Sequence, residues 1–213
     1  MEKEIVVELI KTIPSLLWFL LVLVVIRLFY RPIQDELLPH LTTLKAAGVE
    51  LSFVKDSIDS AIKLAEKSPQ WNVVVPTEDK EHALNRVRQH LKLFRDAQIL
   101  WVDDHPENNL NERGMFRQLK AEIDIARSTE EALEMLKNDE YDLVISDMAR
   151  GSTATAGLDF LKRFRQENKT TSVIFYVGVF DLKKGIPPLA FGVTNRPDEL
   201  LHLTLDALER HKY

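Results

Sequence analysis

The carboxyl-terminal half of the chain alternates short apolar runs with segments of helical periodicity. Between the runs, apolar side chains recur every three or four residues, as in amphipathic helices. This pattern predicts helices at residues 108–120, after the Ser128–Glu131 capping box, at 158–165 and from Pro197 onward. The apolar runs predict strands at residues 99–102, 122–126, 143–146, 173–177 and 191–194. Because such alternation gives a parallel sheet with helices on both faces, we expect a doubly wound, five-stranded α/β fold.

The segment from Arg31 to Ser68 carries apolar residues at helical intervals, and Gly48 is expected to interrupt it. A lone helical stalk has nothing to cover this stripe, so we expect it to pack on itself, on a second copy of the chain or on a membrane surface. Homodimerisation is therefore one expectation. Residues 73–75 predict a short strand, and Thr77 is expected to cap the helix that follows.

Near the amino terminus, fifteen consecutive residues from Thr12 to Ile26 are uncharged. Such a helix rises about 22 Å, and continuing it to Tyr30 approaches the roughly 30 Å of a bilayer core. The acidic start of the chain and the lack of a small-residue cleavage site disfavour a cleaved signal peptide. A buried core helix is the remaining alternative. We expect a single transmembrane helix.

These segments predict three parts of the chain. They are a transmembrane anchor at residues 1–30, a helical stalk at 31–96 and the α/β domain at 97–213. Basic residues are slightly more frequent after the uncharged run than before it, which favours a cytoplasmic carboxyl-terminal portion. We therefore expect a single-pass protein of the inner (cytoplasmic) membrane.

Composition narrows the class of function. The formal net charge of −5 argues against a general nucleic-acid-binding protein. The absence of cysteine excludes disulfides, thiolate zinc sites and cysteine nucleophiles. The sequence also lacks a glycine-rich phosphate loop, a GxSxG motif and histidines at metal-ligand spacing, so we expect no enzyme. No DNA-binding segment follows the last predicted helix, which disfavours direct control of transcription.

Three carboxylates follow two of the predicted strands. Asp103 and Asp104 come directly after the first strand, and Asp147 follows the third. These strands are neighbours in a doubly wound sheet, so we expect the carboxylates to meet in one pocket. A divalent cation would keep them ionised, and oxygen ligands favour Mg²⁺. A carboxylate beside Mg²⁺ can attack a phosphoryl donor, whereas the plainer alternative is that these residues only cap helices or begin turns.

The same half contains the motifs ILWVDDHPENN (residues 99–109), LVISDM (143–148) and Gly157 followed by LDFLKRFR. With the order of the elements, these motifs make residues 97–213 resemble a response-regulator receiver domain. The resemblance implies a flavodoxin-like fold and a place in two-component signalling, with Asp147 as the acceptor of a phosphoryl group from a histidine kinase. It further implies Mg²⁺ as cofactor, held by Asp103, Asp104, Asp147 and the backbone carbonyl of Ala149.

Several positions depart from the receiver pattern. Val177 stands where receivers end the fourth strand with Ser or Thr, and its side chain makes no hydrogen bond. In place of the Lys-Pro after the fifth strand, the chain offers Thr194 or Asn195, with Arg196 as the nearest cation. The segment Gly185-Ile186-Pro187-Pro188 shortens or breaks the fourth helix.

Two functions fit these features. The first is a membrane-anchored, atypical response-regulator-like signalling protein that binds Mg²⁺ and accepts phosphate on Asp147. The second is a degenerate receiver that binds a protein partner without phosphorylation, in a stress or defence system. The sequence identifies neither the kinase nor the protein partner.

Overall fold

The computed structural model describes residues 17–24, 27, 38–67, 73–167, 170–179 and 185–212, with only the backbone described at 38–51 and 212. The chain divides into two compact units, Met1–Gly48 and Val49–Tyr213. The second unit contains the α/β domain.

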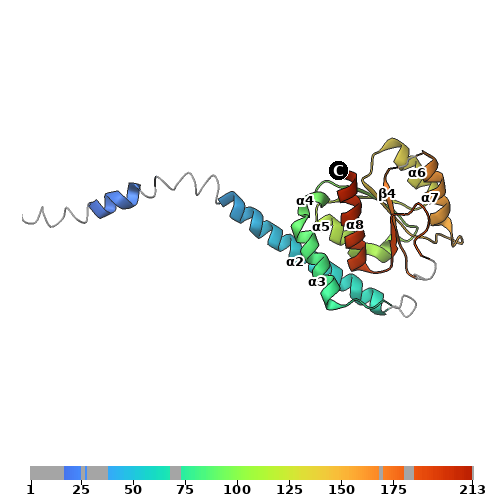
Figure 1. The fold of residues 1–213 in the computed structure, drawn as a ribbon, viewed down its shortest axis with the longest axis horizontal. Coiled ribbons are helices and arrows are strands. Elements are labelled where there is room, and N and C mark those ends of the chain that lie inside the picture. Colours follow the sequence, from blue (N-terminus) through green and yellow to red (C-terminus); the bar gives the residue numbers. More distant parts are fainter. Residues whose placement is uncertain are drawn as a thin grey trace, which may run out of the picture. The chain divides into compact units, whose positions relative to one another are not determined.

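The sheet of this domain has five parallel strands in the order β2-β1-β3-β4-β5. The strands are β1 (Gln98–Val102), β2 (Glu122–Ala126), β3 (Leu143–Ser146), β4 (Ser172–Tyr176) and β5 (Gly192–Thr194) (Figure 1). Val102 at the end of β1 pairs with Ser146 at the end of β3, so the residues that follow both strands emerge side by side. The predicted strands and the neighbouring positions of β1 and β3 are confirmed.

Two layers of helices cover the sheet. The helices within the domain are η2 (Pro106–Asn109), α5 (Leu110–Gln118), α6 (Thr129–Asn138), α7 (Ala156–Glu167) and α8 (Pro197–Lys212). The predicted capping box is confirmed at α6, where Ser128 Oγ accepts a hydrogen bond from the Glu131 backbone N–H at 3.1 Å. The carboxylate of Glu131 in turn accepts one from the Arg127 N–H at 2.7 Å.

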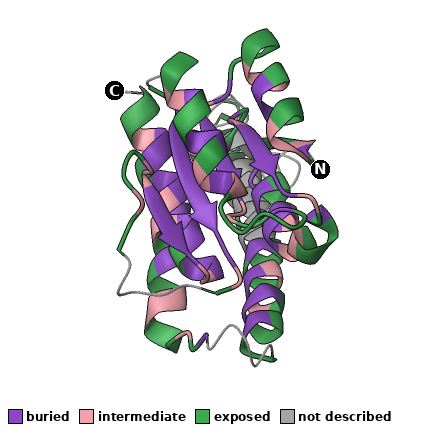
Figure 2. Cartoon of the chain, turned by 90° about the vertical axis from the view of Figure 1, so that its right-hand side faces the viewer, coloured by how far each residue is buried: buried purple, intermediate pink, exposed green. Residues whose placement is uncertain are grey.

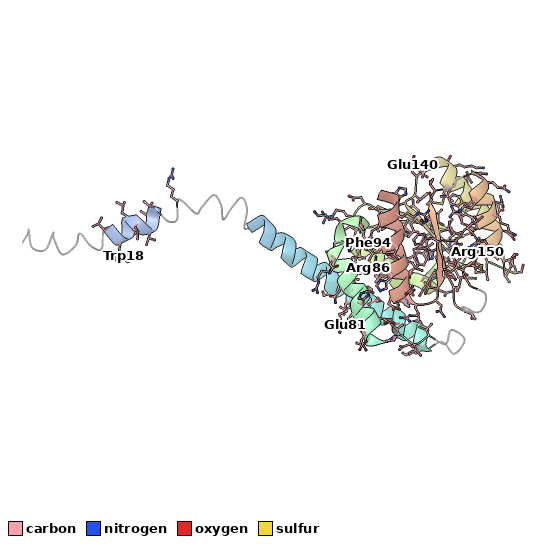
Figure 3. All side chains as sticks on the ribbon, in the orientation of Figure 1. Trp18, Glu81, Arg86, Phe94, Glu140 and Arg150 are labelled. Carbon is pink, nitrogen blue, oxygen red and sulfur yellow. The ribbon has the colours of Figure 1, made fainter. Side chains whose placement is uncertain are left out.

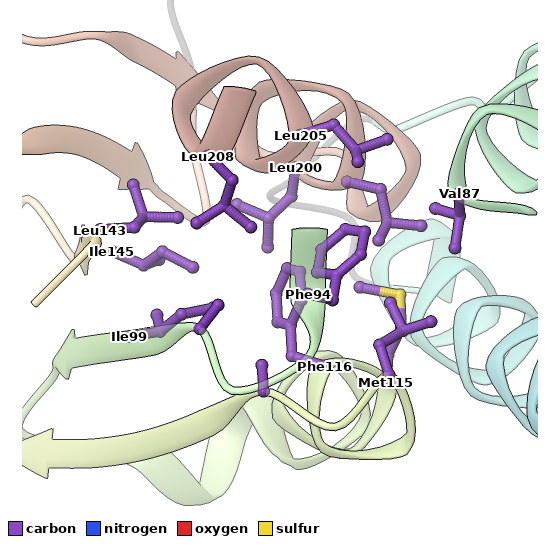
Figure 4. Packing of buried hydrophobic residues seen from close by; sticks show 14 of the residues in the cluster. Val87, Phe94, Ile99, Met115, Phe116, Leu143, Ile145, Leu200, Leu205 and Leu208 are labelled. Atoms are coloured by element: carbon purple, nitrogen blue, oxygen red, sulfur yellow. The ribbon is translucent and has the colours of Figure 1, made fainter. Parts of the chain in front are cut away.

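Each face of the sheet has its own core because successive strand residues point to opposite sides. Ile99 and Trp101 of β1 pack with α5, α8 and Phe94, whereas Leu100 and Val102 pack with α6 and α7. Figure 4 shows Phe94 between the leucines of α8 and the side chains of α5. Strands β1, β3, β4 and β5 are buried along most of their length, whereas the edge strand β2 alternates buried and exposed residues (Figure 2). This difference explains the continuous apolar sequence of the inner strands and the alternating one of β2.

Helices upstream of the sheet contribute to one of these cores. They are α2 (Leu38–Lys67), α3 (Thr77–Gln89) and α4 (Leu91–Phe94). The buried stripe of α2 and α3 belongs to the same cluster as Ile99 and Trp101, and it includes Val54, Ile58, Ile62, Ala83 and Val87. For this part of the apolar stripe, the covering surface is therefore the α/β domain of the same chain.

Three local expectations are wrong. Helix α2 continues through Gly48, since one glycine costs a helix only about 1 kcal/mol relative to alanine. Residues 73–75 form no strand. Thr77 is the first residue of α3, and the N-cap position belongs to Pro76, which makes no side-chain cap. A proline fits here because it has no N–H to satisfy.

The expected membrane anchor is also corrected. Among the residues that the structure describes, no helix is both long and apolar enough to span a bilayer. Residues 17–24 are helical, and eight residues rise only about 12 Å against a hydrocarbon core of roughly 30 Å. The rest of the expected anchor, at residues 1–16, 25–26 and 28–30, lies outside the described residues. The prediction of a single-pass inner-membrane protein is therefore wrong.

Candidate functional site: an acidic pocket at the ends of β1 and β3

The three aspartates predicted from the sequence lie together. Asp103, Asp104 and Asp147 each offer a carboxylate oxygen, and these atoms lie within 4.8 Å of one another. They line an open cavity of about 260 Å³ at the carboxyl ends of β1 and β3, together with Ala149. Asp103 is 3% exposed, and the other two are partly buried. The parallel register of β1 and β3 brings the carboxylates together.

Hydrogen bonds from neutral donors hold the carboxylates in place. Asp103 accepts from the His105 backbone N–H at 2.8 Å and from the Asn109 side-chain amide at 2.7 Å. Asp104 accepts from the Gly151 N–H at 2.8 Å, and Asp147 accepts from the N–H of the residue that follows it at 2.7 Å. No ion pair joins these carboxylates to a Lys or Arg within the described residues. The pocket is therefore rich in negative charge.

Burial, together with the neighbouring Asp103 carboxylate, raises the pKa of Asp147 to about 6, against the lowering effects of backbone N–H groups and of Arg150. Such a shift means that the folded protein holds this carboxylate in an unfavourable environment. A cation that neutralises the pocket would relieve the repulsion.

Arg150 fixes the loop after β3, and the sequence analysis did not single it out. Arg150 is only 7% exposed. Its guanidinium donates to Ser146 Oγ at 2.9 Å and to the backbone carbonyl of Asp147 at 2.7 Å. It also donates to Thr129 Oγ1 and to a carbonyl at the start of α7. Arg150 thus positions the backbone of Asp147 without neutralising its carboxylate. In the sequence, the only sign of this role was that Arg150 is a lone basic residue in a polar loop.

Gly157 lies against the same backbone. A Cβ atom at this position would approach the Asp147 carbonyl oxygen to 2.7 Å and the ring of Phe175 to 2.8 Å. Only glycine therefore allows α7 to begin this close to the end of β3. This close approach gives a physical reason for the glycine in the motif.

Of the residues that depart from the receiver pattern, some line the acidic cavity and others do not. Val177 and Gly178 line the acidic cavity, so an apolar side chain and a bare backbone occupy that wall. Thr194, Asn195 and Arg196 are not among the residues that line it. No described residue between β4 and β5 is helical, in agreement with the break expected at residues 185–188.

Arg196 is engaged elsewhere, at the contact between α3 and α8. Its guanidinium pairs with Asp79 at 2.6 Å and with Asp198, whose side chain is 1% exposed. On the same contact, Arg86 pairs with Asp206 at 2.6 Å. We call this set of five side chains the α3–α8 contact. The hydrogen bond to Asp198 raises the pKa of Arg196.

A buried polar pair lies beside the cavity wall and was also missed. Tyr176 Oη donates to Glu112 Oε1 at 2.8 Å, and both residues are buried. Burial raises the pKa of Glu112. The sequence did offer a sign of this pair, because Glu112 stands among the apolar residues of a predicted helix. A carboxylate on the core face of a helix requires a hydrogen-bonding partner.

Comparisons with known proteins identify the family of the α/β domain. The family model for the response regulator receiver domain matches residues 99–193. This part of the chain is a response regulator receiver domain, as its motifs indicated.

Among curated proteins, the chain is 26% identical over 141 residues to the autoinducer 2 sensor kinase/phosphatase LuxQ of Vibrio parahaemolyticus. The match covers 61% of this chain but only 16% of that protein. The chain thus corresponds to a small portion of that relative's length.

Solved structures with similar folds include the signal receiver domain of an HD domain-containing protein from Pseudomonas fluorescens. It is 30% identical, with 55% of this chain and 98% of that chain covered and a TM-score of 0.48. Another is the response regulator TrrA of Thermotoga maritima in complex with Mg²⁺ and BeF. It is 25% identical, with 52% of this chain and 98% of that chain covered and a TM-score of 0.47.

Proposed function

We propose that this protein is a two-component signalling protein whose receiver domain binds Mg²⁺ and accepts a phosphoryl group on Asp147 from a histidine kinase. The observation that carries the proposal is the meeting of Asp103, Asp104 and Asp147 in one open cavity. The phosphoryl group ends on the protein's own side chain, so the protein acts as a switch that a kinase sets and not as an enzyme with an external substrate.

The residues present fit a Mg²⁺ ion. Their ligand atoms are carboxylate oxygens, which suit a hard cation, and Ala149, which would offer its backbone carbonyl, lines the same cavity. Asp103, Asp104, Asp147 and that carbonyl would hold the ion. When bound, it supplies positive charge that offsets the carboxylates and the charge developing on the transferred group.

The chain's own residues prepare the acceptor for transfer. The Arg150 and Gly157 contacts fix the backbone of Asp147, while the open cavity leaves its carboxylate accessible. One carboxylate oxygen attacks phosphorus as the bond between phosphorus and the kinase histidine nitrogen breaks. The freed imidazole nitrogen takes the electron pair of the broken bond. The phosphoryl group is then bound to Asp147 as an aspartyl phosphate.

A specific observation favours the second function, a receiver that binds its partner without phosphorylation. Val177 offers no hydroxyl to a phosphoryl group, and Arg196 is held by Asp79 and Asp198 outside the cavity. Each charge-assisted hydrogen bond that a phosphoryl group lacks costs about 1.5 to 3 kcal/mol. Under this alternative the pocket binds a cation for structural reasons only, and the partner recognises one fixed conformation.

One experiment separates the two functions. The full chain is incubated with Mg²⁺ and acetyl phosphate, and its intact mass is measured beside those of Asp147→Asn and of Glu140→Gln, a control at an exposed carboxylate. We expect one added phosphoryl group in wild type and in Glu140→Gln and none in Asp147→Asn. No added mass in wild type, with normal cellular function of Asp147→Asn, would favour the second function.

Homodimerisation remains a separate proposal. Phe53 of α2 is 50% exposed, which leaves apolar surface for a second copy. Light scattering of the full chain over a range of concentrations tests it. A monomeric mass at every concentration would contradict it.

A further inference from the structure

His105 lies at the rim of the acidic pocket, immediately after the Asp103–Asp104 pair. Its Nε2 atom is 3.8 Å from Asp104 Oδ2, and the residue lines the same cavity as the three carboxylates. No Lys or Arg lines this cavity among the described residues, so His105 contributes its only basic side chain. An imidazole nitrogen in this place is a further donor atom for a bound cation.

A second carboxylate orients the imidazole. Glu107 Oε1 is 3.0 Å from His105 Nδ1, on the opposite side of the ring from Nε2. His105 Nδ1 therefore faces Glu107, and Nε2 faces the Asp104 side of the cavity. Histidines that bind metals commonly donate their other ring N–H to a carboxylate in this way. Glu107 and His105 thus have the arrangement of a ligand and its supporting residue.

The backbone around His105 is fixed, whereas its side chain is free to adjust. The His105 N–H donates to Asp103, and Arg113 donates to the carbonyl of the buried Pro106 at 2.7 Å. The side chain of His105 is 67% exposed. It stands outside the group of oxygens that lie within 4.8 Å of one another, so ligation requires a rotation of this exposed side chain. Glu107, 57% exposed, can follow it.

We propose that His105 Nε2 is a ligand of the cation held by Asp104 and Asp147, and that the pocket consequently prefers Mn²⁺ and similar transition metals to Mg²⁺. The proposal rests on the proposed function for cation binding and specifies which cation the site selects. Imidazole binds first-row transition metals well, whereas Mg²⁺ prefers oxygen ligands and retains its water. A nitrogen ligand added to three carboxylates therefore shifts the order of affinities toward Mn²⁺.

The test compares affinities in the metal-free, untagged full chain. Wild type, His105→Ala and His82→Ala are each titrated with Mg²⁺ and with Mn²⁺ in a calorimeter, and His82, exposed on α3, serves as the matched control. Loss of His105 should lower Mn²⁺ affinity about tenfold or more, because losing even a residue that only supports a ligand typically costs about tenfold, with much less change for Mg²⁺. His82→Ala should behave as wild type.

Pulsed electron paramagnetic resonance of the bound Mn²⁺ gives a direct readout. We expect coupling to an imidazole ¹⁴N nucleus in wild type and in His82→Ala, and none in His105→Ala. If Mn²⁺ binds without nitrogen coupling and the two metals lose affinity equally in His105→Ala, this inference is wrong while the proposed cation site stands. If wild type binds neither metal, both proposals are wrong.

Discussion

Charged side chains are arranged in opposite ways in the acidic pocket and in the α3–α8 contact. In the pocket, three carboxylates meet with no Lys or Arg ion pair among the described residues. In the contact, Arg196 and Arg86 each pair with aspartates at 2.6 Å. Figure 3 shows Arg86, on α3, and Arg150, beside the pocket, at well-separated places on the domain. Opposite charges attract and like charges repel, so we expect the contact to favour the folded state and the pocket to favour a bound cation, as proposed above.

The largest expected effect on stability comes from a substitution in the apolar packing of α2 and α3. Ile58 is fully buried, so Ile58→Ala should lower the free energy of unfolding by about 2 to 5 kcal/mol through lost burial and the cavity left behind. Phe53→Ala, at a half-exposed position on the same helix, is the control and should cost much less. Urea denaturation measures both. Equal effects would mean that α2 does not belong to the core of the domain.

Arg196→Gln should have the next largest effect. It leaves Asp198, with a side chain only 1% exposed, as a buried carboxylate without its cation, and we expect a loss of about 2 to 3 kcal/mol in urea denaturation. Arg88→Gln, at an exposed position on α3, should change stability by less than about 0.5 kcal/mol. Similar values for the two variants would show that Arg196 is not required to hold the contact.

Asp147→Asn should act in the opposite direction and stabilise the metal-free protein. The pKa of Asp147 is raised to about 6, above its unfolded value, so the folded state binds the proton more tightly and stability is lost as the pH rises through 6. After allowance for partial exposure, removing the charge should add about 1 to 2 kcal/mol at pH 8 and little at pH 4. Destabilisation at pH 8 would show that the carboxylate is compensated in the folded protein.

The smallest expected effect is the response of the α3–α8 region to acid. His202 Nδ1 lies 3.2 Å from a nitrogen of Arg86, which can only donate, so His202 is neutral there. Burial and Arg86 lower the pKa of His202. Because its folded pKa lies below the unfolded value, stability is present above about pH 6.5 and declines slightly as the pH falls below it.

An NMR titration of the His202 ring checks this expectation, and a pKa above 6.5 would contradict it. His202→Gln should reduce the loss of stability between pH 7 and pH 5 measured by thermal unfolding. The ring of the exposed His82, whose centroid is 5.3 Å from that of His202, should be followed in the same spectra.

The sequence predicted the pocket better than the contact for a physical reason. The position of Asp103 and Asp147 follows from two local facts, a buried strand and the parallel pairing of neighbouring strands. One partner of Arg196, Asp79, lies 117 residues away on α3. Nothing in the sequence around Arg196 or around Asp79 indicates that the two residues pair. Periodicity likewise identified the apolar stripe of α2 but gave no information about what covers it, and the α/β domain proved to be the cover.

Local chemistry also explains the smaller errors. A run of valines at residues 73–75 has strand propensity, but a strand needs a neighbour with which to pair, and none is formed. The uncharged run at Thr12–Ile26 suggested a membrane span from hydropathy, yet no helix among the described residues is both long and apolar enough to cross a bilayer.

Because α2 and α3 share a core with the sheet, the shortest fragment of this protein that folds by itself is expected to include both helices. The family match begins at residue 99, but the compact unit begins at Val49. A chain truncated at the family boundary would expose to water the apolar surfaces of α5 and α8 that Val54, Ile58 and Val87 share. We expect such a truncation to aggregate during purification, whereas one that begins at Val49 keeps the whole core. Gene fusions and crystallisation trials should therefore retain the residues between those two boundaries.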